Sequence, residues 1–246
     1  MVTKVALVTG ASSGIGAAIS KELVKRGWQV VGIARSLDKL DQLQKELSEP
    51  FIPIVCDVSQ KDQIVKASSS ILEKGLIPSL LFLNAGIAGE PAVENPDKFD
   101  LSTHEKIMSV NYMGVLAWVE YWEKPCMENG GANFIVTSSV NAIFAPPTGS
   151  AYAASKAAIA KAFEGLALTY HNTPLKFSIV YPGPVDTPGL KGKLPFTWSA
   201  EKMGKSMVDS AIQKKYRYYP SVFYRILAQL LHSLPVRYTE KLLKRL

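Results

Sequence analysis

Tyr152 and Lys156 have the chemistry and the spacing that proton transfer requires. Residues four positions apart lie on one face of a helix, so the phenol and the ammonium group are expected to be neighbours. An isolated tyrosine has a pKa of about 10, and a nearby positive charge favours the phenolate. The pair therefore predicts a proton relay for the interconversion of a carbonyl and an alcohol. Because such pairs are also common on helix surfaces, the position of the pair in the fold decides between the two interpretations.

Ser139 closely follows an apolar run, residues 134–137, that is typical of a buried strand. In doubly wound sheets, ligands bind beyond the carboxyl ends of the strands. Ser139 is thus expected at the same edge as the start of the Tyr152 helix, where its hydroxyl would hydrogen-bond a substrate oxygen. The alternative is that Ser138 and Ser139 only end the strand, and Ser138 fits that role.

A glycine-rich turn, residues 9–16, lies between an apolar run and a helical pattern. Gly10 allows a tight turn, Gly14 lets the backbone approach a pyrophosphate, and Gly16 lets the helix pack close to the strand. The N-terminus of that helix would offer free N–H groups and partial positive charge to phosphates. The alternative is a turn without a ligand. The residues expected to contact a dinucleotide here are Gly10, Ser12, Ser13, Gly14, Ile15 and Gly16.

The end of the second apolar run indicates which dinucleotide binds. An NAD site usually has an acidic residue here that bonds the adenosine 2′-hydroxyl. Ala34 lacks such a group, whereas the guanidinium of Arg35 can pair with a 2′-phosphate and Ser36 can add a hydroxyl bond. The alternative is that Arg35 is a solvated loop residue and Ser36 a helix cap, with Asp38 in the first turn of that helix. The pattern favours NADP(H) over NAD(H).

Short apolar runs alternate with helical periodicity along the chain. Strands are expected over residues 5–9, 30–34, 52–56, 80–83, 134–137 and 177–181. Helices are expected over residues 14–26, 38–48, 64–74, 103–122 and 152–170. A capping box of Ser102 and Glu105 is expected to open the fourth helix. This alternation predicts an α/β fold, a doubly wound parallel sheet of the Rossmann type in a single domain. Residues 188–199, rich in Gly, Pro and Lys, are expected to form a flexible flap.

Composition excludes several classes of protein. Hydrophobic residues make up 47% of the 246 residues and charged residues 20%, which is typical of a globular domain rather than a disordered or fibrous chain. There is no apolar run of about 18 residues and no signal-peptide pattern. Cys56 and Cys126 show no metal or disulfide spacing, so free thiols, no metal site and a cytoplasmic location are expected.

The net charge of +7 is concentrated in the last part of the chain. Residues 1–201 carry 18 Lys and Arg against 19 Asp and Glu, whereas residues 202–246 carry 10 against 2. No groove-reading motif accompanies these cations, so a nucleic-acid partner is not expected.

These motifs together resemble those of the short-chain dehydrogenases/reductases, of the compact single-domain type, over residues 3–187. The glycine turn matches the family pattern Thr-Gly-x-x-x-Gly-x-Gly, and Ser139 stands thirteen residues before Tyr152, as in the family. The other matching positions are Asp57, Val58, Asn84, Ala85, Gly86, Asn111, Lys156, Pro182, Gly183, Val185 and Thr187. Leu83 replaces an asparagine that is common in the family, and the last forty or so residues diverge.

The resemblance implies a role for each matching position. Asp57 and Val58 would bind the adenine. Residues 84–86 would stabilise the sheet and border the adenine ribose, and residues 182–187 would hold the nicotinamide carboxamide. Tyr152 and Lys156 would also contact the cofactor near its nicotinamide ribose.

The resemblance also implies a mechanism. Tyr152 would protonate the alkoxide as hydride arrives, and Lys156 would lower the pKa of Tyr152. Ser139 would orient the carbonyl, while the backbone of Asn111 would hold a water of the proton relay. The implied protein is an NADP(H)-dependent carbonyl reductase.

Other functions on this fold are a non-catalytic dinucleotide sensor, an epimerase or dehydratase, and a lyase that uses no nucleotide. The first would have lost Tyr152, Lys156 or Ser139, the second would carry a larger substrate domain, and the third would lack the glycine turn. The loops around the expected site are apolar, which favours a lipophilic ketone or aldehyde. The residues expected to line the substrate pocket are Ile143, Phe144, Pro146, Pro147, Pro184, Leu190 and Phe196.

The helices over residues 103–122 and 152–170 are expected to carry apolar faces too broad for one sheet to cover. Equivalent helices pair across a two-fold axis in relatives. The expected assembly is therefore a homodimer or a homotetramer.

Residues 1–220 are expected to form the NADP(H)-binding catalytic domain, followed by an amphipathic, basic tail over residues 221–246. Its apolar positions at helical spacing are Val222, Phe223, Ile226, Leu227, Leu230, Leu231, Leu242, Leu243 and Leu246. Flanking cations are typical of a helix at a membrane interface, but also of a helix that packs on its own fold or on a partner subunit. Packing is the favoured interpretation, and peripheral membrane contact stays open as the alternative.

Overall fold

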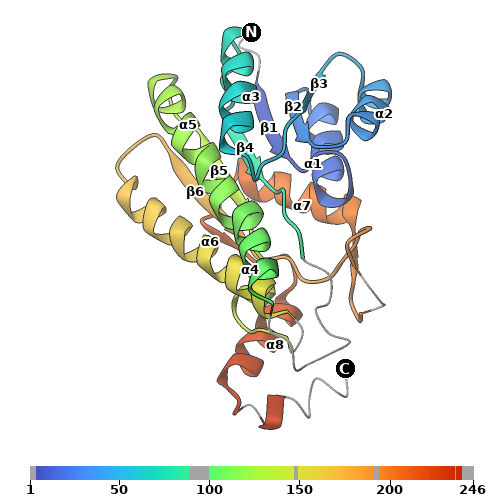
Figure 1. Ribbon diagram of the computed structural model, residues 1–246, viewed down its shortest axis with the longest axis vertical. Helices are drawn as coiled ribbons and strands as arrows, with labels where there is room; N and C mark the ends of the chain where they lie inside the picture. The colour runs from blue at the N-terminus through green and yellow to red at the C-terminus, as the bar shows by residue number, and fades with distance from the viewer. Residues whose placement is uncertain (1–3, 89–99, 147–148, 191–193, 236, 240–246) are drawn as a thin grey trace.

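The computed structural model describes residues 4–88, 100–146, 149–190, 194–235 and 237–239 (Figure 1). Within them, seven parallel strands form one sheet in the order β3-β2-β1-β4-β5-β6-β9. The strands are β1 Val5–Thr9, β2 Gln29–Ala34, β3 Phe51–Val55, β4 Leu80–Leu83, β5 Asn133–Thr137, β6 Lys176–Val180 and β9 Arg217–Tyr218. The predicted doubly wound parallel sheet is confirmed, and its order reverses beside β1, between β1 and β4.

All six predicted strands form within one residue of the expected bounds. The seventh, β9, pairs with the end of β6 through Arg217 and Tyr218. A strand of two residues is too short to produce an apolar run, and the Arg217 and Tyr218 side chains end in polar groups. The sequence pattern therefore did not predict this strand. A small second sheet pairs β7 (Val185–Asp186) with β8 (Trp198–Ser199), so the end of the segment expected to be a flexible flap is a strand.

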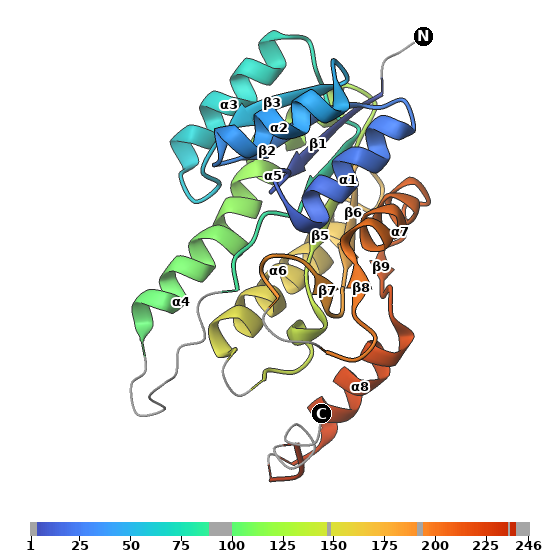
Figure 2. The same cartoon turned by 90° about the vertical axis from the view of Figure 1, so that its right-hand side faces the viewer.

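Helices cover both faces of the sheet. On one face, α3 (Lys61–Glu73), α5 (Gly114–Glu128) and α6 (Ser150–Thr169) pack over strand residues such as Leu7, Leu81 and Phe134. On the other face, α1 (Gly14–Lys25), α2 (Leu37–Leu47) and α7 (Ala200–Ile212) pack over Ala6 and Val8. Successive strand side chains point to opposite faces, which explains why β1 is buried along its whole length. Figures 1 and 2 show α1 and α7 across the sheet from α5 and α6.

The fourth predicted helix differs from expectation at its start and in its middle. Helix α4 (Leu101–Met108) is capped by Asp100, whose carboxylate accepts hydrogen bonds from the Ser102 amide at 3.1 Å and from the Ser102 and Thr103 hydroxyls. The predicted capping box of Ser102 and Glu105 is therefore wrong, because an acid two residues earlier already satisfies these donors. A π-helical turn, Ser109–Met113, joins α4 to α5, and the helix continues beyond residue 122 to Glu128.

The tail forms a helix over nearly the predicted range. Helix α8 (Val222–Ser233) begins after Ser221, whose hydroxyl accepts a hydrogen bond from the Tyr224 amide. It buries Tyr224, Ala228 and Leu231, so it packs on its own fold, at the end of the molecule beyond the carboxyl edge of the sheet (Figure 2). The predicted apolar positions of residues 242–246 lie outside the described residues. None of the helices among the described residues is both long and apolar enough to cross a membrane.

Candidate active site

A pocket of about 890 Å³ opens at the carboxyl edge of the sheet. The loops after β1 to β6 line it, together with the start of α6 and one face of α8. Of the predicted site residues, those that line the pocket are Gly10, Ser12, Ser13, Gly14, Ile15, Arg35, Asp57, Val58, Asn84, Ala85, Gly86, Ser139, Tyr152, Lys156, Pro182, Gly183, Val185 and Thr187. Gly16 and Asn111 do not line the pocket but support its wall. Gly16 lets α1 start close to β1, and Asn111 joins the loop after β4 to α6.

The glycine turn has the geometry of an anion cradle. Gly10 and Gly14 have φ values of 70° and 52°, in the left-handed region that favours glycine. A Cβ on Gly16 would lie 2.1 Å from the carbonyl oxygen of Gly10, so only glycine allows α1 to start this close to β1. Ser13 caps α1 without a side-chain hydrogen bond. The turn therefore directs the helix N-terminus into the pocket and leaves its first amides for a negatively charged ligand.

Hydrogen bonds between strand ends hold this turn in place. The Thr9 hydroxyl accepts from the backbone amides of Asn84 and Ala85, each at 3.0 Å. The Asn84 side chain donates to the Thr9 carbonyl at 3.3 Å and accepts from the Thr137 hydroxyl at 3.1 Å. These bonds link the ends of β1, β4 and β5. Thr9 and Thr137 were not among the predicted site residues, because a threonine at a strand end gives no distinguishing pattern.

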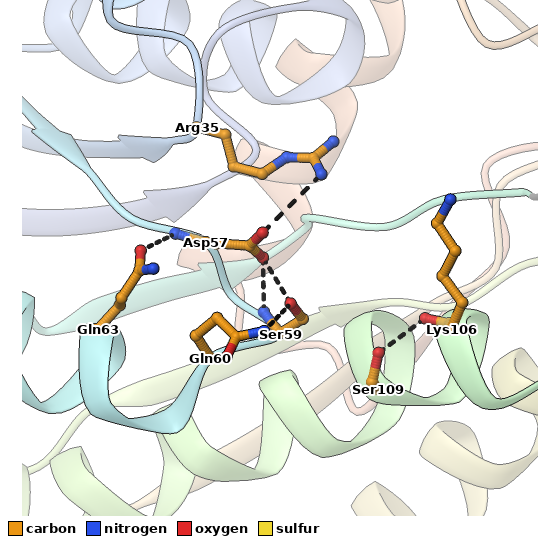
Figure 3. A network of polar contacts seen from close by, with 7 residues as sticks. All are labelled: Arg35, Asp57, Ser59, Gln60, Gln63, Lys106 and Ser109. Atoms are coloured by element: carbon orange, nitrogen blue, oxygen red, sulfur yellow. Dashed lines mark hydrogen bonds and ion pairs between the residues drawn. The ribbon is translucent and has the colours of Figure 1, made fainter.

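Charged groups meet where the second and third strands end (Figure 3). The Arg35 guanidinium lies 4.0 Å from the Asp57 carboxylate, and its side chain is 68% exposed. Asp57 is oriented by the amide and hydroxyl of Ser59 at 2.9 and 2.8 Å, and its own amide donates to the Gln63 side chain. Arg35 is thus a surface cation at the pocket rim that keeps donors available for a further anion. Ala34 beside it also lines the pocket, and it carries no acid.

Lys156 is buried, and its ammonium group donates to the carbonyl of Thr137 at 2.7 Å. The same group lies 5.6 Å from the centre of the Tyr152 ring. Burial lowers the pKa of Lys156 to about 8. The helix therefore places the two side chains next to each other, as their spacing predicted.

The pKa of Tyr152 differs from the expectation of a lowered value. Burial raises it, and a hydrogen bond with Ser139 opposes that rise only in part. The ammonium group of Lys156 is directed to the Thr137 carbonyl. Ser139 and Tyr152 do face each other in the pocket, whereas Ser138 donates to the Lys156 carbonyl and is buried. The Ser139 hydroxyl also accepts a hydrogen bond from the Asn141 amide at 3.1 Å, so it caps the short helix after β5 as well as facing Tyr152.

Asn111 lies in the π-helical turn and is 1% exposed. Its side chain accepts from the Ile87 amide at 2.8 Å and donates to the Ile87 carbonyl and to the Ser155 hydroxyl. Ser155 in turn donates to the Tyr152 carbonyl at 2.7 Å. Asn111 therefore joins the loop after β4 to the helix that carries Tyr152. Ser155 was missed, because nothing in a sequence distinguishes it from other small helix residues.

The far end of the pocket is apolar. Phe144, Pro146, Pro184 and Leu190 line it as predicted, while Ile143 and Phe196 do not and Pro147 lies outside the described residues. Helix α8 supplies three further lining residues, Tyr224, Leu227 and Leu231. The Tyr224 ring packs on Gly183, where a Cβ would lie 2.8 Å from it, and its hydroxyl donates to the Pro195 carbonyl. These contacts join segments far apart in the sequence, so no local pattern could have predicted them.

Matches to a family model, to two relatives and to one solved structure identify the class of protein. A family model described as short chain dehydrogenase matches residues 4–196. A farnesol dehydrogenase from Aedes aegypti is 31% identical over 193 residues, which cover 75% of this chain and 78% of the relative. A probable NADP-dependent dehydrogenase from Haemophilus influenzae is 27% identical over 183 residues, which cover 74% and 72%. A short chain dehydrogenase/reductase from Burkholderia phymatum, solved in complex with NAD, has a TM-score of 0.84 at 20% identity, covering 94% of this chain and 93% of that one.

The fold and the extent of these matches define an oxidoreductase that acts on CH–OH groups. The chain belongs to the short-chain dehydrogenase/reductase family.

The buried lysine makes a prediction about stability and pH. Lysine has an ordinary pKa of 10.5, and Lys156 in the fold has one of about 8. Between these values the unfolded chain holds a proton that the folded protein has released, so the free energy of unfolding rises with pH in that window. Relative to a Lys156→Met variant, the protein should gain stability at up to about 1.4 kcal/mol per pH unit above pH 8.

Urea unfolding of both proteins between pH 7 and pH 10 measures this difference. Lys74→Met, at an exposed lysine that follows α3, is the control for the loss of a lysine that is not buried. A Lys156 difference that stays constant across the window would contradict the prediction.

Proposed function

We propose that this protein is an NADP(H)-dependent carbonyl reductase that converts a lipophilic ketone or aldehyde to an alcohol, or runs the reverse reaction. The observation that carries the proposal is the convergence of Ser139, Tyr152 and Lys156 on one pocket with the glycine turn. The proposed domain comprises residues 1–220, and residues 221–246 belong to it through α8. A cytoplasmic location is proposed because Cys56 and Cys126 are free thiols.

The pocket fits a dinucleotide on structural grounds. Its volume suits a large ligand, and the glycine turn brings backbone within reach of a pyrophosphate. Asp57 and Val58 would hold the adenine, residues 84–86 would border its ribose, and Val185 and Thr187 would hold the carboxamide. When bound, the nicotinamide supplies or accepts a hydride.

The proposed roles of the catalytic residues follow from their contacts. Ser139 donates a hydrogen bond to the carbonyl oxygen, and Tyr152 delivers a proton to the same oxygen as negative charge develops there. The raised pKa of Tyr152 means that the phenol carries its proton at neutral pH, which is the form that a proton donor needs. Lys156 holds the nicotinamide ribose, and the resulting cationic site assists Tyr152. Asn111 positions the helix start and contributes its backbone to the proton relay.

Two observations support a lipophilic substrate. The far end of the pocket is lined by side chains without charge, including Phe144, Leu190, Leu227 and Leu231. The relative from Aedes aegypti is named as a farnesol dehydrogenase, and farnesol is a long apolar alcohol. A screen of apolar carbonyl compounds with NADPH, followed at the nicotinamide absorbance, tests the proposal. Failure of the whole screen with a protein that binds NADPH would argue against it.

The first prediction concerns the proton donor. Tyr152→Phe keeps the ring and removes the acidic proton, so turnover on a true substrate should fall by about 100- to 10,000-fold while NADPH affinity stays within a factor of a few. Tyr216→Phe is the control, because Tyr216 is 41% exposed and directly precedes the edge strand β9. This variant should leave turnover and NADPH affinity unchanged. Retention of most of the wild-type kcat by Tyr152→Phe would exclude the proton-donor role.

The second prediction concerns the cofactor. Arg35 would pair with the 2′-phosphate, so Arg35→Ala should weaken NADPH binding by about 1.5–3 kcal/mol and affect NADH little. Ala34→Asp should shift preference toward NADH. Lys45→Ala, an exposed cation further along α2, is the control. The Haemophilus influenzae relative supports NADP, whereas the Burkholderia phymatum structure holds NAD. Equal affinity of the parent protein for NADH and NADPH would contradict the assignment.

The third prediction concerns assembly. We infer a homodimer or homotetramer in which α4, α5 and α6 contact a second copy. Leu101 on α4, Met113 at the end of the π-helical turn before α5 and Leu168 on α6 are 60%, 59% and 73% exposed, although they are apolar. Light scattering at micromolar concentration should give a mass of at least two chains, and a monomer there would rule the assembly out.

A further inference from the structure

Helix α8 has apolar side chains on two faces. The inner face carries Tyr224 and Leu231, which are buried and line the pocket. The outer face carries Val222, Ile226 and Leu230, which are 66%, 60% and 49% exposed. These three residues are spaced four apart, so they form one continuous line along the helix. The inner face accounts for the docking of the helix on its own fold, but nothing among the described residues covers the outer line.

Two aromatic side chains widen this outer line. Phe223 is 43% exposed, and its ring centre lies 4.8 Å from that of Phe196, which is 66% exposed. We call Phe196, Val222, Phe223, Ile226 and Leu230 the outer ridge. Figure 2 shows α8 at the extremity of the molecule, and the ridge residues on this helix are exposed. A contiguous exposed apolar patch of this kind marks an interaction site.

The charges around the ridge have one sign. Residues 213–239 contain five Lys or Arg and no Asp or Glu, and Arg225 on α8 and Arg237 after it are exposed. The sequence of residues 188–199, which leads to Phe196, adds Lys191 and Lys193 and again no acid. Apolar side chains flanked by cations are complementary to the interface of a bilayer with anionic headgroups.

From these observations we propose that the outer ridge inserts into the surface of an anionic membrane, with α8 lying in the plane of the interface. A second copy of this chain fits less well. An isologous contact would bring together two copies of one patch whose flanking charged residues, Arg225 and Arg237 among them, are all cations, and like charges oppose that pairing. An anionic lipid surface neutralises them instead.

The position of the ridge links docking to the pocket. The helix that carries Ile226 on its outer face carries Leu227 and Leu231 on the wall of the pocket. The Tyr224 hydroxyl also holds the Pro195 carbonyl, next to Phe196 of the ridge. Docking through the ridge therefore places the helix that forms this apolar wall of the pocket at the lipid surface. Passage of an apolar substrate from the bilayer to the pocket rests on the proposed function, whereas docking itself does not.

Flotation of the full chain with lipid vesicles tests the proposal. The probes are vesicles of phosphatidylcholine alone and of phosphatidylcholine mixed with phosphatidylserine, at low and high salt. We expect binding to the mixed vesicles at low salt, at least tenfold weaker binding to the neutral ones, and weakening by salt. The triple variant Val222→Gln, Ile226→Gln, Leu230→Gln should lose at least tenfold in vesicle affinity. Its thermal unfolding midpoint should match that of the parent, because these side chains are exposed.

The matched control is Val65→Gln with Leu72→Gln, two apolar residues on α3 that are 41% and 38% exposed. This variant should bind mixed vesicles like the parent. The proposal is overturned if the parent protein does not bind mixed vesicles at low salt, or if the triple variant binds mixed vesicles as well as the control variant does. It is also overturned if the triple variant splits the assembly in light scattering, which would make the ridge a contact between copies. The assay contains no cofactor or substrate, so its failure would leave the proposed reduction untouched.

Discussion

Thr137, the last residue of β5, makes two hydrogen bonds on which the geometry of the pocket depends. Its carbonyl accepts from the buried ammonium of Lys156 at 2.7 Å, and its hydroxyl donates to the side chain of Asn84. Asn84 in turn holds Thr9 at the start of the glycine turn. One strand end thus fixes α6, which carries Tyr152 and Lys156, relative to the glycine turn. Because parallel strands end at the same edge, the fold brings these residues together without a long loop.

This arrangement buries a positively charged group, the ammonium of Lys156. Burial lowers the pKa of Lys156 to about 8, and the group that accepts a hydrogen bond from its ammonium is a neutral carbonyl, that of Thr137. Gly86 leaves space beside it, since a Cβ there would lie 3.1 Å from the ammonium group. A cation held in this way interacts strongly with polar groups of a ligand, because little water screens it. Burial also raises the pKa of Tyr152, which keeps the phenol protonated. Burial therefore shifts the pKa values of the two side chains in opposite directions.

The sequence predicted those parts of the fold whose physical signal lies in residues that are neighbours along the chain. Five of the six main strands are buried along almost their whole length and the edge strand β3 is still rich in apolar residues, so each strand is an apolar run. The glycine turn needs residues without Cβ at fixed places. The family motifs extended this reading to the pocket wall. The π-helical turn escaped prediction, because it arises where Gly114 approaches the Val58 carbonyl so closely that a Cβ would lie 2.1 Å from it. The part of α8 in the pocket also escaped, since amphipathic spacing does not say what a helix packs against.

The central claim is that this pocket transfers a hydride between NADP(H) and a carbonyl carbon. Its most direct test is turnover of apolar ketones with NADPH that carries deuterium at C4 of the nicotinamide, one position labelled at a time. The account predicts that deuterium from one of the two labelled forms appears on the carbinol carbon of the product, and that none appears with Tyr152→Phe on the same timescale. Binding of NADPH without label transfer to any ketone, or label transfer that is equally fast in Tyr152→Phe, would contradict it.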